Sequence, residues 1–275
     1  GRALPTFSAK STKKAAGALA VLAVLPNGKP VAVDSMTRDI VARARAAAHL
    51  VDTPPTELDP QALASAAKRV LKSLRGVTLN ELVGDQMLKA KLGGIHAVGR
   101  CARSAPRLLL AQCGPQRGSH MALVGKGVTY DTGGLHLKAG GMMETMKSDM
   151  GGAAAVLGAF AVLAASKPRH RLSLLLCLAE NAIGPAAYKP DDVLTLHSGK
   201  TVEINNTDAE GRLLLADGCS YAARVLGADV ILDAATLTGA QGIATGDLHA
   251  AVVSSEDRKS TRLNSSHSSV FRMPS

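Results

Sequence analysis

The pattern of apolar and polar positions changes its period repeatedly along the chain. Residues 37–50 carry apolar side chains at helical spacing, with one face made by Ile40, Val41, Ala44, Ala47 and Ala48. This helix is expected to end at the Thr-Pro-Pro sequence of residues 53–55, because a residue that precedes proline avoids the α-helical region. A second helix is predicted from Asp59-Pro60 to about Leu74, with Asp59 as the N-cap and Pro60 in the first position.

Short apolar runs predict strands at residues 77–79, 108–112, 121–124, 171–178, 201–204 and 229–232. The run Leu-Ser-Leu-Leu-Leu-Cys-Leu at 172–178 is typical of a strand that is covered on both faces. Further helices are predicted over residues 86–92, closed by Gly93 and Gly94, over residues 151–166, opened by Ser148 or Asp149, and over residues 209–226.

Strands that alternate with helices predict an α/β fold, with three αβα layers around a mostly parallel, mixed sheet. Ligands of such sheets bind beyond the carboxyl ends of the strands. The predicted loops 125–138 and 205–212 lie there and hold the most unusual polar residues of the chain. The functional site is therefore expected in these two loops.

Composition narrows the function classes. The chain has 275 residues, 46% of them apolar and 2% aromatic, which excludes a collagen, a coiled coil and a fully disordered protein. The formal charge is +10, of which residues 257–275 contribute +3, and there is no run of five basic residues. A solvated basic surface is therefore favoured over nucleic-acid binding, which also needs exposed aromatic side chains for base stacking.

The cysteines and the two ends of the chain indicate the cellular compartment and the limits of the folded part. The four cysteines are far apart and lack a CxxC pair, which favours buried thiols in a reducing compartment. The apolar run at residues 15–25 is too short to span a bilayer, and Asn27-Gly28 predicts a hairpin turn between residues 18–25 and 30–33. We expect a cytoplasmic protein without a membrane segment. Residues 257–275 show neither the helical nor the strand period of apolar residues, and they look like a non-native tail.

The first candidate motif is Val-Gly-Lys-Gly-Val-Thr-Tyr-Asp-Thr-Gly-Gly at residues 124–134. Lys126 lies between two glycines at the end of a predicted strand, and Asp131 follows five residues later. Glycines permit close backbone approach, which suggests a ligand cradle; the alternative is a tight turn with a surface lysine. The phosphate-binding pattern GxxxxGK[ST] is absent.

Two further motifs are Lys138 followed by Lys-Ser-Asp-Met-Gly-Gly at residues 147–152, and Asn-Asn-Thr-Asp-Ala-Glu-Gly-Arg at residues 205–212. Asp149 has an alternative role as a helix N-cap. If residues 208–212 are extended, Asp208, Glu210 and Arg212 share one side of the chain. Capping and complementation of the helix dipole are the alternative, but they explain only one of the acids.

Taken together, these loops supply four carboxylates: Asp131, Asp149, Asp208 and Glu210. Four converging carboxylates repel one another unless cations neutralise them. Two divalent ions such as Mn²⁺, Mg²⁺ or Zn²⁺, about 3.5–4 Å apart, can activate water and polarise a carbonyl group. The patterns HExxH and GxSxG are absent, and we interpret His136 and His197 as loop or surface residues.

These motifs resemble those of the leucyl aminopeptidase (M17) family of binuclear metallo-aminopeptidases. Asn-Thr-Asp-Ala-Glu-Gly-Arg-Leu at residues 206–213 resembles the signature of that family, and residues 124–134, 147–152, 178–181, 190–192 and 235–240 are similar too. Residues 199–211 and 238–249 are most similar to the probable aminopeptidase-like branch. The resemblance runs from about residue 38 to residue 256.

The resemblance implies a role for each candidate residue. It assigns a tighter Zn²⁺ or Mn²⁺ ion to Lys126, Asp131, Asp149 and Glu210. It assigns an exchangeable ion to Asp131, Asp208 and Glu210, so that Asp131 and Glu210 bridge both. It implies that Lys138 polarises the scissile carbonyl and that Arg212 holds a bicarbonate acting as general base. The implied substrates are peptides with a free N-terminus and a Leu-like first residue, and the implied assembly is a homo-hexamer.

The resemblance also implies a division of the chain. Residues 1–36 are expected to be the remnant of an N-terminal domain, residues 37–256 a C-terminally truncated catalytic domain, and residues 257–275 the tail. The predicted function is N-terminal peptide hydrolysis by a metal-activated water. Two alternatives stay open, an inactive truncated homologue and a basic nucleic-acid-binding scaffold.

Overall fold

The computed structural model describes residues 24, 26–246, 248–254 and 268–272. They form two compact units, with the boundary between Thr236 and Leu237. The larger unit holds the sheet and every candidate site residue. The smaller unit contains α7 (Gly239–Thr245) and an antiparallel pair of strands, β8 (His249–Val253) and β9 (Ser268–Arg272).

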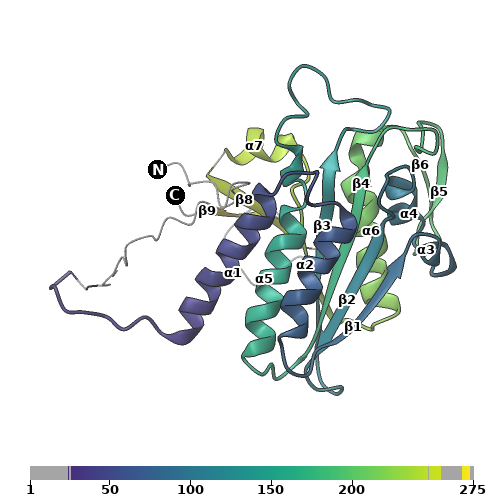
Figure 1. Ribbon diagram of the computed structural model, residues 1–275. Helices are drawn as coiled ribbons and strands as arrows, with labels where there is room; N and C mark the ends of the chain where they lie inside the picture. Colours follow the sequence, from purple (N-terminus) through teal and green to yellow (C-terminus); the bar gives the residue numbers. More distant parts are fainter. Residues whose placement is uncertain (1–23, 25, 247, 255–267, 273–275) are drawn as a thin grey trace. The chain divides into compact units, whose positions relative to one another are not determined.

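The sheet of the larger unit is mixed and mostly parallel, as predicted. Its strands lie in the order β1 (Thr78–Val83), β2 (Arg107–Cys113), β4 (Arg171–Asn181), β3 (His120–Asp131) and β7 (Val230–Ala234). β3 pairs in parallel with β4 and β7, whereas β2 pairs antiparallel with β1 and β4. In this sheet only β2 therefore points the opposite way (Figure 1).

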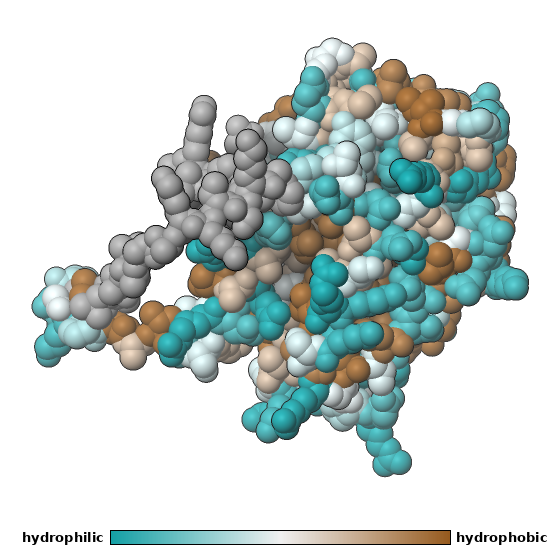
Figure 2. Space-filling model, viewed as in Figure 1, coloured by the Kyte–Doolittle hydropathy of each residue, from teal (hydrophilic) through white to brown (hydrophobic). Residues whose placement is uncertain are grey.

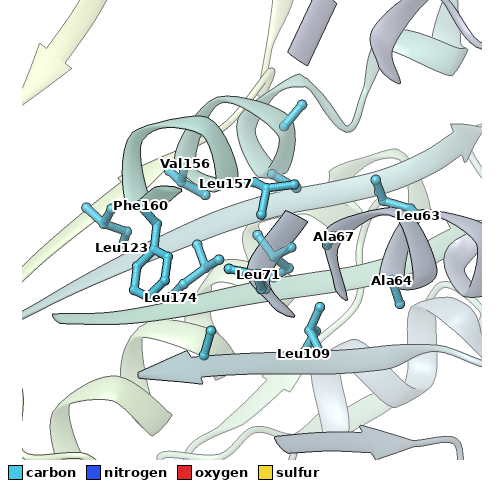
Figure 3. Packing of buried hydrophobic residues seen from close by; sticks show 14 of the residues in the cluster. Leu63, Ala64, Ala67, Leu71, Leu109, Leu123, Val156, Leu157, Phe160 and Leu174 are labelled. Carbon is cyan, nitrogen blue, oxygen red and sulfur yellow. The ribbon is translucent and has the colours of Figure 1, made fainter. Parts of the chain in front are cut away.

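Helices cover both faces of the sheet and make the three predicted layers (Figure 1). On one face, α2 (Pro60–Lys72) and α5 (Gly151–Ala165) pack through Leu71 and Phe160 against Leu174 (Figure 3). On the other face, α4 (Gly93–Gly99) and α6 (Glu210–Arg224) pack against Leu175. Leu174 and Leu175 are both fully buried because neighbouring strand residues point to opposite faces.

Capping explains where two of the helices begin. Asp59 accepts a hydrogen bond from the Ala62 amide at 2.7 Å, and Pro60 occupies the first position of α2, as predicted. The first predicted helix is α1 (Ser35–Asp52), which begins two residues earlier than expected because Asp34 caps it through the Thr37 amide at 2.8 Å. α1 packs on α5 and leaves Met36, Ile40 and Val41 exposed.

One predicted helix boundary is wrong. The helix predicted for residues 86–92 is the short α3 (Gln86–Lys89), and the glycine pair that was expected to close it lies at the start of α4. The buried carboxylate of Asp217 accepts hydrogen bonds from the Gly94 and Ile95 amides at 2.7 and 3.0 Å. A distant acceptor therefore makes this glycine pair a helix start.

Two of the connections contain small elements of their own. Residues 193–195 and 201–203 form the hairpin β5 (Val193–Thr195) and β6 (Thr201–Glu203), of which only the second strand was predicted. Two 3₁₀ turns, η1 (Met146–Ser148) and η2 (Thr207–Ala209), precede α5 and α6. The stretch Met146–Ala165 is long and apolar enough to cross a membrane, but 61% of its apolar 18-residue window is buried inside the protein, as in a core helix.

Some predictions fall wholly or partly outside the described residues. Residues 1–23 and 25, and with them most of the first strand of the predicted hairpin, are not described, but Asn27-Gly28 lies in a turn and Val24 forms a bridge with Pro30. In the tail, residues 255–267 and 273–275 are not described. Within the tail, Ser268–Arg272 forms β9, although the sequence shows neither a helical nor a strand period there. The four cysteines are free thiols.

Candidate metal centre

The first motif belongs to a strand and not to a loop. β3 continues to Asp131, so Lys126 and Asp131 both lie on the sheet, and the predicted loop begins only at Thr132. A Cβ atom at Gly125 would lie 2.6 Å from the Cα atom of Ala153. This glycine therefore lets α5 pack closely on β3 and does not form a ligand cradle. Lys126 is 2% exposed, so the alternative of a surface lysine is also wrong.

The amine of Lys126 is surrounded by oxygen atoms. Its Nζ lies 2.7 Å from Oδ1 of Asp149 and 3.0 Å from Oε1 of Glu210, and it donates to the carbonyl of Thr236 at 2.8 Å. Burial by itself lowers the pKa of Lys126, but the two carboxylates outweigh burial and raise the pKa above its usual value. Without a bound cation, this lysine is protonated.

Asp149 does not cap α5. The N-cap residue is Met150, which makes no side-chain capping bond, so the predicted capping by Ser148 or Asp149 is wrong. Oδ1 of Asp149 instead accepts hydrogen bonds from Lys126 and from Oγ1 of Thr236, at 2.7 and 2.9 Å. Burial raises the pKa of Asp149 to about 7, partly offset by Lys126.

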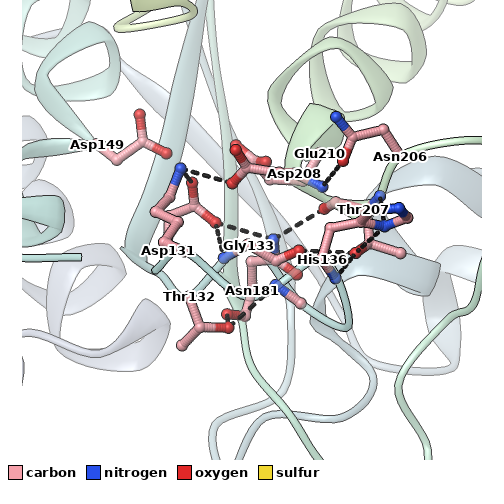
Figure 4. A network of polar contacts seen from close by, with 12 residues as sticks. Asp131, Thr132, Gly133, His136, Asp149, Asn181, Asn206, Thr207, Asp208 and Glu210 are labelled. Carbon is pink, nitrogen blue, oxygen red and sulfur yellow. Dashed lines mark hydrogen bonds and ion pairs between the residues drawn. The ribbon is translucent and has the colours of Figure 1, made fainter. Parts of the chain in front are cut away.

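Three carboxylates from separate elements come together at the end of β3 (Figure 4). One carboxylate oxygen each of Asp131, Asp208 and Glu210 lies within 4.8 Å of the other two. Nζ of Lys138 contacts Oδ2 of Asp131 at 2.9 Å and Oδ1 of Asp208 at 2.5 Å. These two carboxylates raise the pKa of Lys138, although burial opposes them.

The predicted extended arrangement of residues 208–212 is wrong. Asp208 lies in η2 and Glu210 begins α6, so the segment is helical. Glu210 is buried against Lys126, whereas Arg212 is exposed in the first turn of α6. The structure thus brings together six of the seven predicted site residues through the contacts given above, and places Arg212 outside this cluster.

The charges and the unpaired atoms of this cluster fit divalent cations. Four carboxylates face two ammonium groups, so positive charge is deficient when all are ionised. Oδ2 of Asp149 and Oε2 of Glu210 are buried and lack a hydrogen-bond partner among the described residues. Buried carboxylate oxygens are seldom left without a hydrogen-bond partner. A ligand set of carboxylate oxygens and one amine nitrogen suits Mn²⁺ or Zn²⁺. The residues present therefore fit a metal site.

Four uncharged residues of this site had no role in the sequence analysis: Asn181, Tyr188, Thr207 and Thr236. Asn181 is the last residue of β4 and the register partner of Asp131. Two sequence signals point to it: a polar residue at the carboxyl end of a buried apolar strand, and its place in residues 178–181, which resemble the leucyl aminopeptidase family. His136 is an exposed loop residue, as expected, and its Nδ1 accepts a hydrogen bond from the Thr207 amide at 3.2 Å (Figure 4).

Comparison with known proteins identifies the family. Residues 45–274 match the family described as "Cytosol aminopeptidase family, catalytic domain". The chain belongs to this family. It is 53% identical to the mouse (Mus musculus) "Probable aminopeptidase NPEPL1" over 211 residues. This match covers 76% of this chain and 40% of the mouse protein. It is 45% identical over 221 residues to "Leucine aminopeptidase 1" of Caenorhabditis elegans, covering 80% of this chain and 45% of that protein.

Solved structures of the cytosol aminopeptidase family share this fold. The Caenorhabditis elegans leucine aminopeptidase superposes with a TM-score of 0.76 at 45% identity, over 78% of this chain and 44% of that one. The leucyl aminopeptidase of Trypanosoma brucei, solved in complex with bestatin, gives a TM-score of 0.76 at 44% identity, over 80% and 43% of the two chains. The chain spans less than half the length of these relatives.

Proposed function

We propose that this member of the cytosol aminopeptidase family is a binuclear metal-dependent aminopeptidase that removes N-terminal, Leu-like residues from peptides. The observation that carries the proposal is the convergence of Asp131, Asp208 and Glu210 beside the buried Lys126 and the half-buried Lys138. Lys126, Asp131, Asp149 and Glu210 are proposed to hold one cation, and Asp131, Asp208 and Glu210 the other. Bound there, divalent cations supply Lewis acidity and activate water near neutral pH.

The lysines have different proposed tasks. Lys126 can bind a cation only as the neutral amine, so its proton must leave when the cation enters. Lys138 is held at the edge of the cluster by Asp131 and Asp208, and its raised pKa keeps the ammonium charged at neutral pH. A charged donor in this position can stabilise the oxyanion that develops on the scissile carbonyl.

Arg212 and the substrate complete the proposal. The Arg212 side chain is exposed in the first turn of α6, two residues after Glu210. We assign it to hold a bicarbonate that accepts a proton from the attacking water. The free α-amine of the peptide is proposed to bind on the side of Asp208, which would account for a preference for chain ends.

The resemblance to the family and the names of relatives support a proposal on assembly and location. Relatives from Streptomyces and Nostoc are named "Probable cytosol aminopeptidase". We propose a cytoplasmic protein that forms a homo-hexamer. Light scattering coupled to size-exclusion chromatography tests the assembly, and a monomer at micromolar concentration would reject it.

The deciding experiment measures hydrolysis of leucine amide by the full-length protein loaded with Mn²⁺. We expect Asp208→Ala to lower kcat/KM by at least about 100-fold, because even the hydrogen-bond partners of metal ligands contribute about 10–100-fold. Asp85→Ala is the matched control, since this carboxylate is exposed and lies outside the cluster.

Two results would reject the proposal. If the metal-loaded protein hydrolyses no aminoacyl amide although it binds Mn²⁺, the chain is an inactive homologue. If it binds no Mn²⁺ but binds DNA with a steep dependence on salt concentration, the nucleic-acid-binding alternative holds.

A further inference from the structure

The neutral side chain of Asn181 connects Asp131 with the turn that carries Asp208. The parallel register of β3 and β4 places Asn181 opposite Asp131, and Asn181 is fully buried. Its Nδ2 donates to Oδ1 of Asp131 at 2.9 Å and to the main-chain oxygen of Thr207 at 3.1 Å (Figure 4). One amide group thus ties the end of β3 to the turn that carries Asp208.

The same carbonyl of Thr207 accepts a second hydrogen bond. The hydroxyl of Tyr188, which is 1% exposed, donates to it at 2.6 Å. Two donors therefore fix the plane of the peptide bond that directly precedes Asp208. Oγ1 of Thr207 adds a bond to the carbonyl of Gly133 at 2.7 Å, so the turn is also held from the β3 side.

The orientation of the Asn181 amide is dictated by these acceptors. Its Oδ1 has no hydrogen-bond partner among the described residues. If the amide were reversed, this oxygen would face Oδ1 of Asp131 and the carbonyl of Thr207, oxygen against oxygen. Only a side chain with two N–H groups on one nitrogen satisfies both acceptors at once.

Two neutral donors orient one oxygen of Asp131, and among the described residues the only charged group in contact with the other oxygen is the amine of Lys138. Oδ1 of Asp131 accepts from Asn181 and from the Gly133 amide at 2.9 Å, while Oδ2 faces the amine of Lys138. Neutral donors orient a carboxylate without cancelling its charge. Hydrogen bonds of this kind to metal ligands typically contribute about 10–100-fold to metal affinity.

We propose that Asn181 and Tyr188 are positioning residues, which hold Asp131 and the peptide between Thr207 and Asp208 in the geometry that binds a divalent cation. The inference rests on the proposed metal-dependent function. It predicts that neither side chain touches the substrate, and that both act on metal affinity through the residues they orient.

The test uses the full-length protein and measures Mn²⁺ binding by electron paramagnetic resonance, together with urea unfolding of the metal-free protein. Asn181→Leu keeps the branched shape and removes both donors, and Tyr188→Phe removes one hydroxyl. We expect each variant to weaken Mn²⁺ binding, within the range of about 10–100-fold. Excess Mn²⁺ is expected to restore kcat with KM unchanged, which a general loss of structure would not do.

Ser173→Ala is the matched control, because Ser173 is a fully buried hydrogen-bonding residue at the opposite end of β4. It is expected to lower stability and to leave Mn²⁺ affinity unchanged. Unchanged Mn²⁺ affinity in both site variants would overturn the inference, as would an equal loss in Ser173→Ala. If Asn181→Leu does not fold, Tyr188→Phe decides. A parent protein that binds no Mn²⁺ would reject the proposed function itself, and the inference with it.

Discussion

At the scale of single residues, the position of Lys126 depends on a missing side chain. Gly211 is the second residue of α6, and a Cβ atom there would lie 2.6 Å from Cε and 2.7 Å from Nζ of Lys126. The amine therefore reaches Asp149 and Glu210 only because α6 presents bare backbone at this point. This glycine serves packing and not a turn.

Gly211→Ala tests this contact. The added methyl group must displace the buried Lys126 amine, so we expect Mn²⁺ affinity and activity to fall. The free energy of unfolding is expected to fall by up to about 2 kcal/mol, because overpacking costs about 1–3 kcal/mol and the helix propensity of alanine returns about 1 kcal/mol. Calorimetric titration with Mn²⁺ and thermal unfolding measure the two effects.

Gly158→Ala in α5 is the control, since a Cβ atom there makes only ordinary contacts, the nearest at 3.5 Å from Arg43. It is expected to leave metal binding intact. Parent-like Mn²⁺ affinity in Gly211→Ala would show that Lys126 can move without consequence.

At the scale of elements, a buried carboxylate organises one helical layer. Asp217 on α6 accepts from the amides of Gly94 and Ile95 at the start of α4, and from the amide of His197 at 2.8 Å. Burial raises the pKa of Asp217, and these three amides oppose the rise. The carboxylate thus substitutes for a local cap of α4, whose own N-cap Leu92 provides none.

Asp217→Asn is expected to destabilise the protein by about 1–3 kcal/mol, because the new NH₂ group faces backbone donors and leaves them unpaired. The free energy of unfolding in urea measures this loss. Asp85→Asn, at an exposed carboxylate next to α3, should have little effect. Equal stability of the two variants would contradict the role of Asp217.

His120 at the start of β3 gives the stability a dependence on pH. Burial and the nearby Arg171 lower the pKa of His120, partly offset by the Leu226 carbonyl. Because the folded-state pKa lies below the unfolded value of 6.5, the unfolded chain takes up the proton more readily. This contribution to stability is therefore complete above that value and is lost as the pH falls below it.

His120→Gln is expected to flatten the loss of stability between about pH 7 and pH 5. Urea unfolding at both values measures the slope. The control is His170→Gln, at an exposed histidine that precedes β4. An unchanged slope in His120→Gln would assign the acid sensitivity to other groups.

At the scale of the whole molecule, polar and apolar residues are interspersed over the visible face (Figure 2). In the sheet, large apolar side chains are exposed on β7. β7 is the last strand in the sheet order, and its Val230 and Leu232 are about half exposed. An edge strand of this kind offers unpaired backbone groups and apolar side chains to other chains.

Val230→Lys is expected to reduce aggregation of this chain, because a charged side chain on an edge strand opposes pairing with another strand. Light scattering against protein concentration measures the effect. Val41→Lys on α1 is the matched control, since Val41 is similarly exposed but its backbone groups lie within a helix. Equal improvement by both variants would point to surface hydropathy and not to the strand edge.

The sequence predicts those features that depend on neighbouring residues. Asp59-Pro60 starts a helix locally, and the apolar run before Asn181 defines a central strand without further information. The sequence places the four carboxylates in predicted loops at the sheet edge, and the structure brings Asp131, Asp208 and Glu210 together.

The predictions of local structure are wrong where a residue far along the chain determines that structure. Gly93 and Gly94 start a helix because Asp217 lies far along the chain, and Gly125 continues a strand because α5 packs on it. The roles of Asn181 and Tyr188 depend on the register of β3 with β4 and on the fold of the turn at Thr207. None of these can be deduced from spacing.

The carboxylates proposed to hold the cation come from segments that are distant in the chain. β3 supplies Asp131, whereas η2 and α6 supply Asp208 and Glu210, and α5, β4 and the β5–β6 hairpin lie between them in the chain. A denatured polypeptide therefore contains no preformed chelate. A cation that binds only the assembled state stabilises that state by mass action. If the proposed cation binds, we expect it to slow unfolding of the native protein and to change the rate of folding little, because the segments that would hold it are distant in sequence.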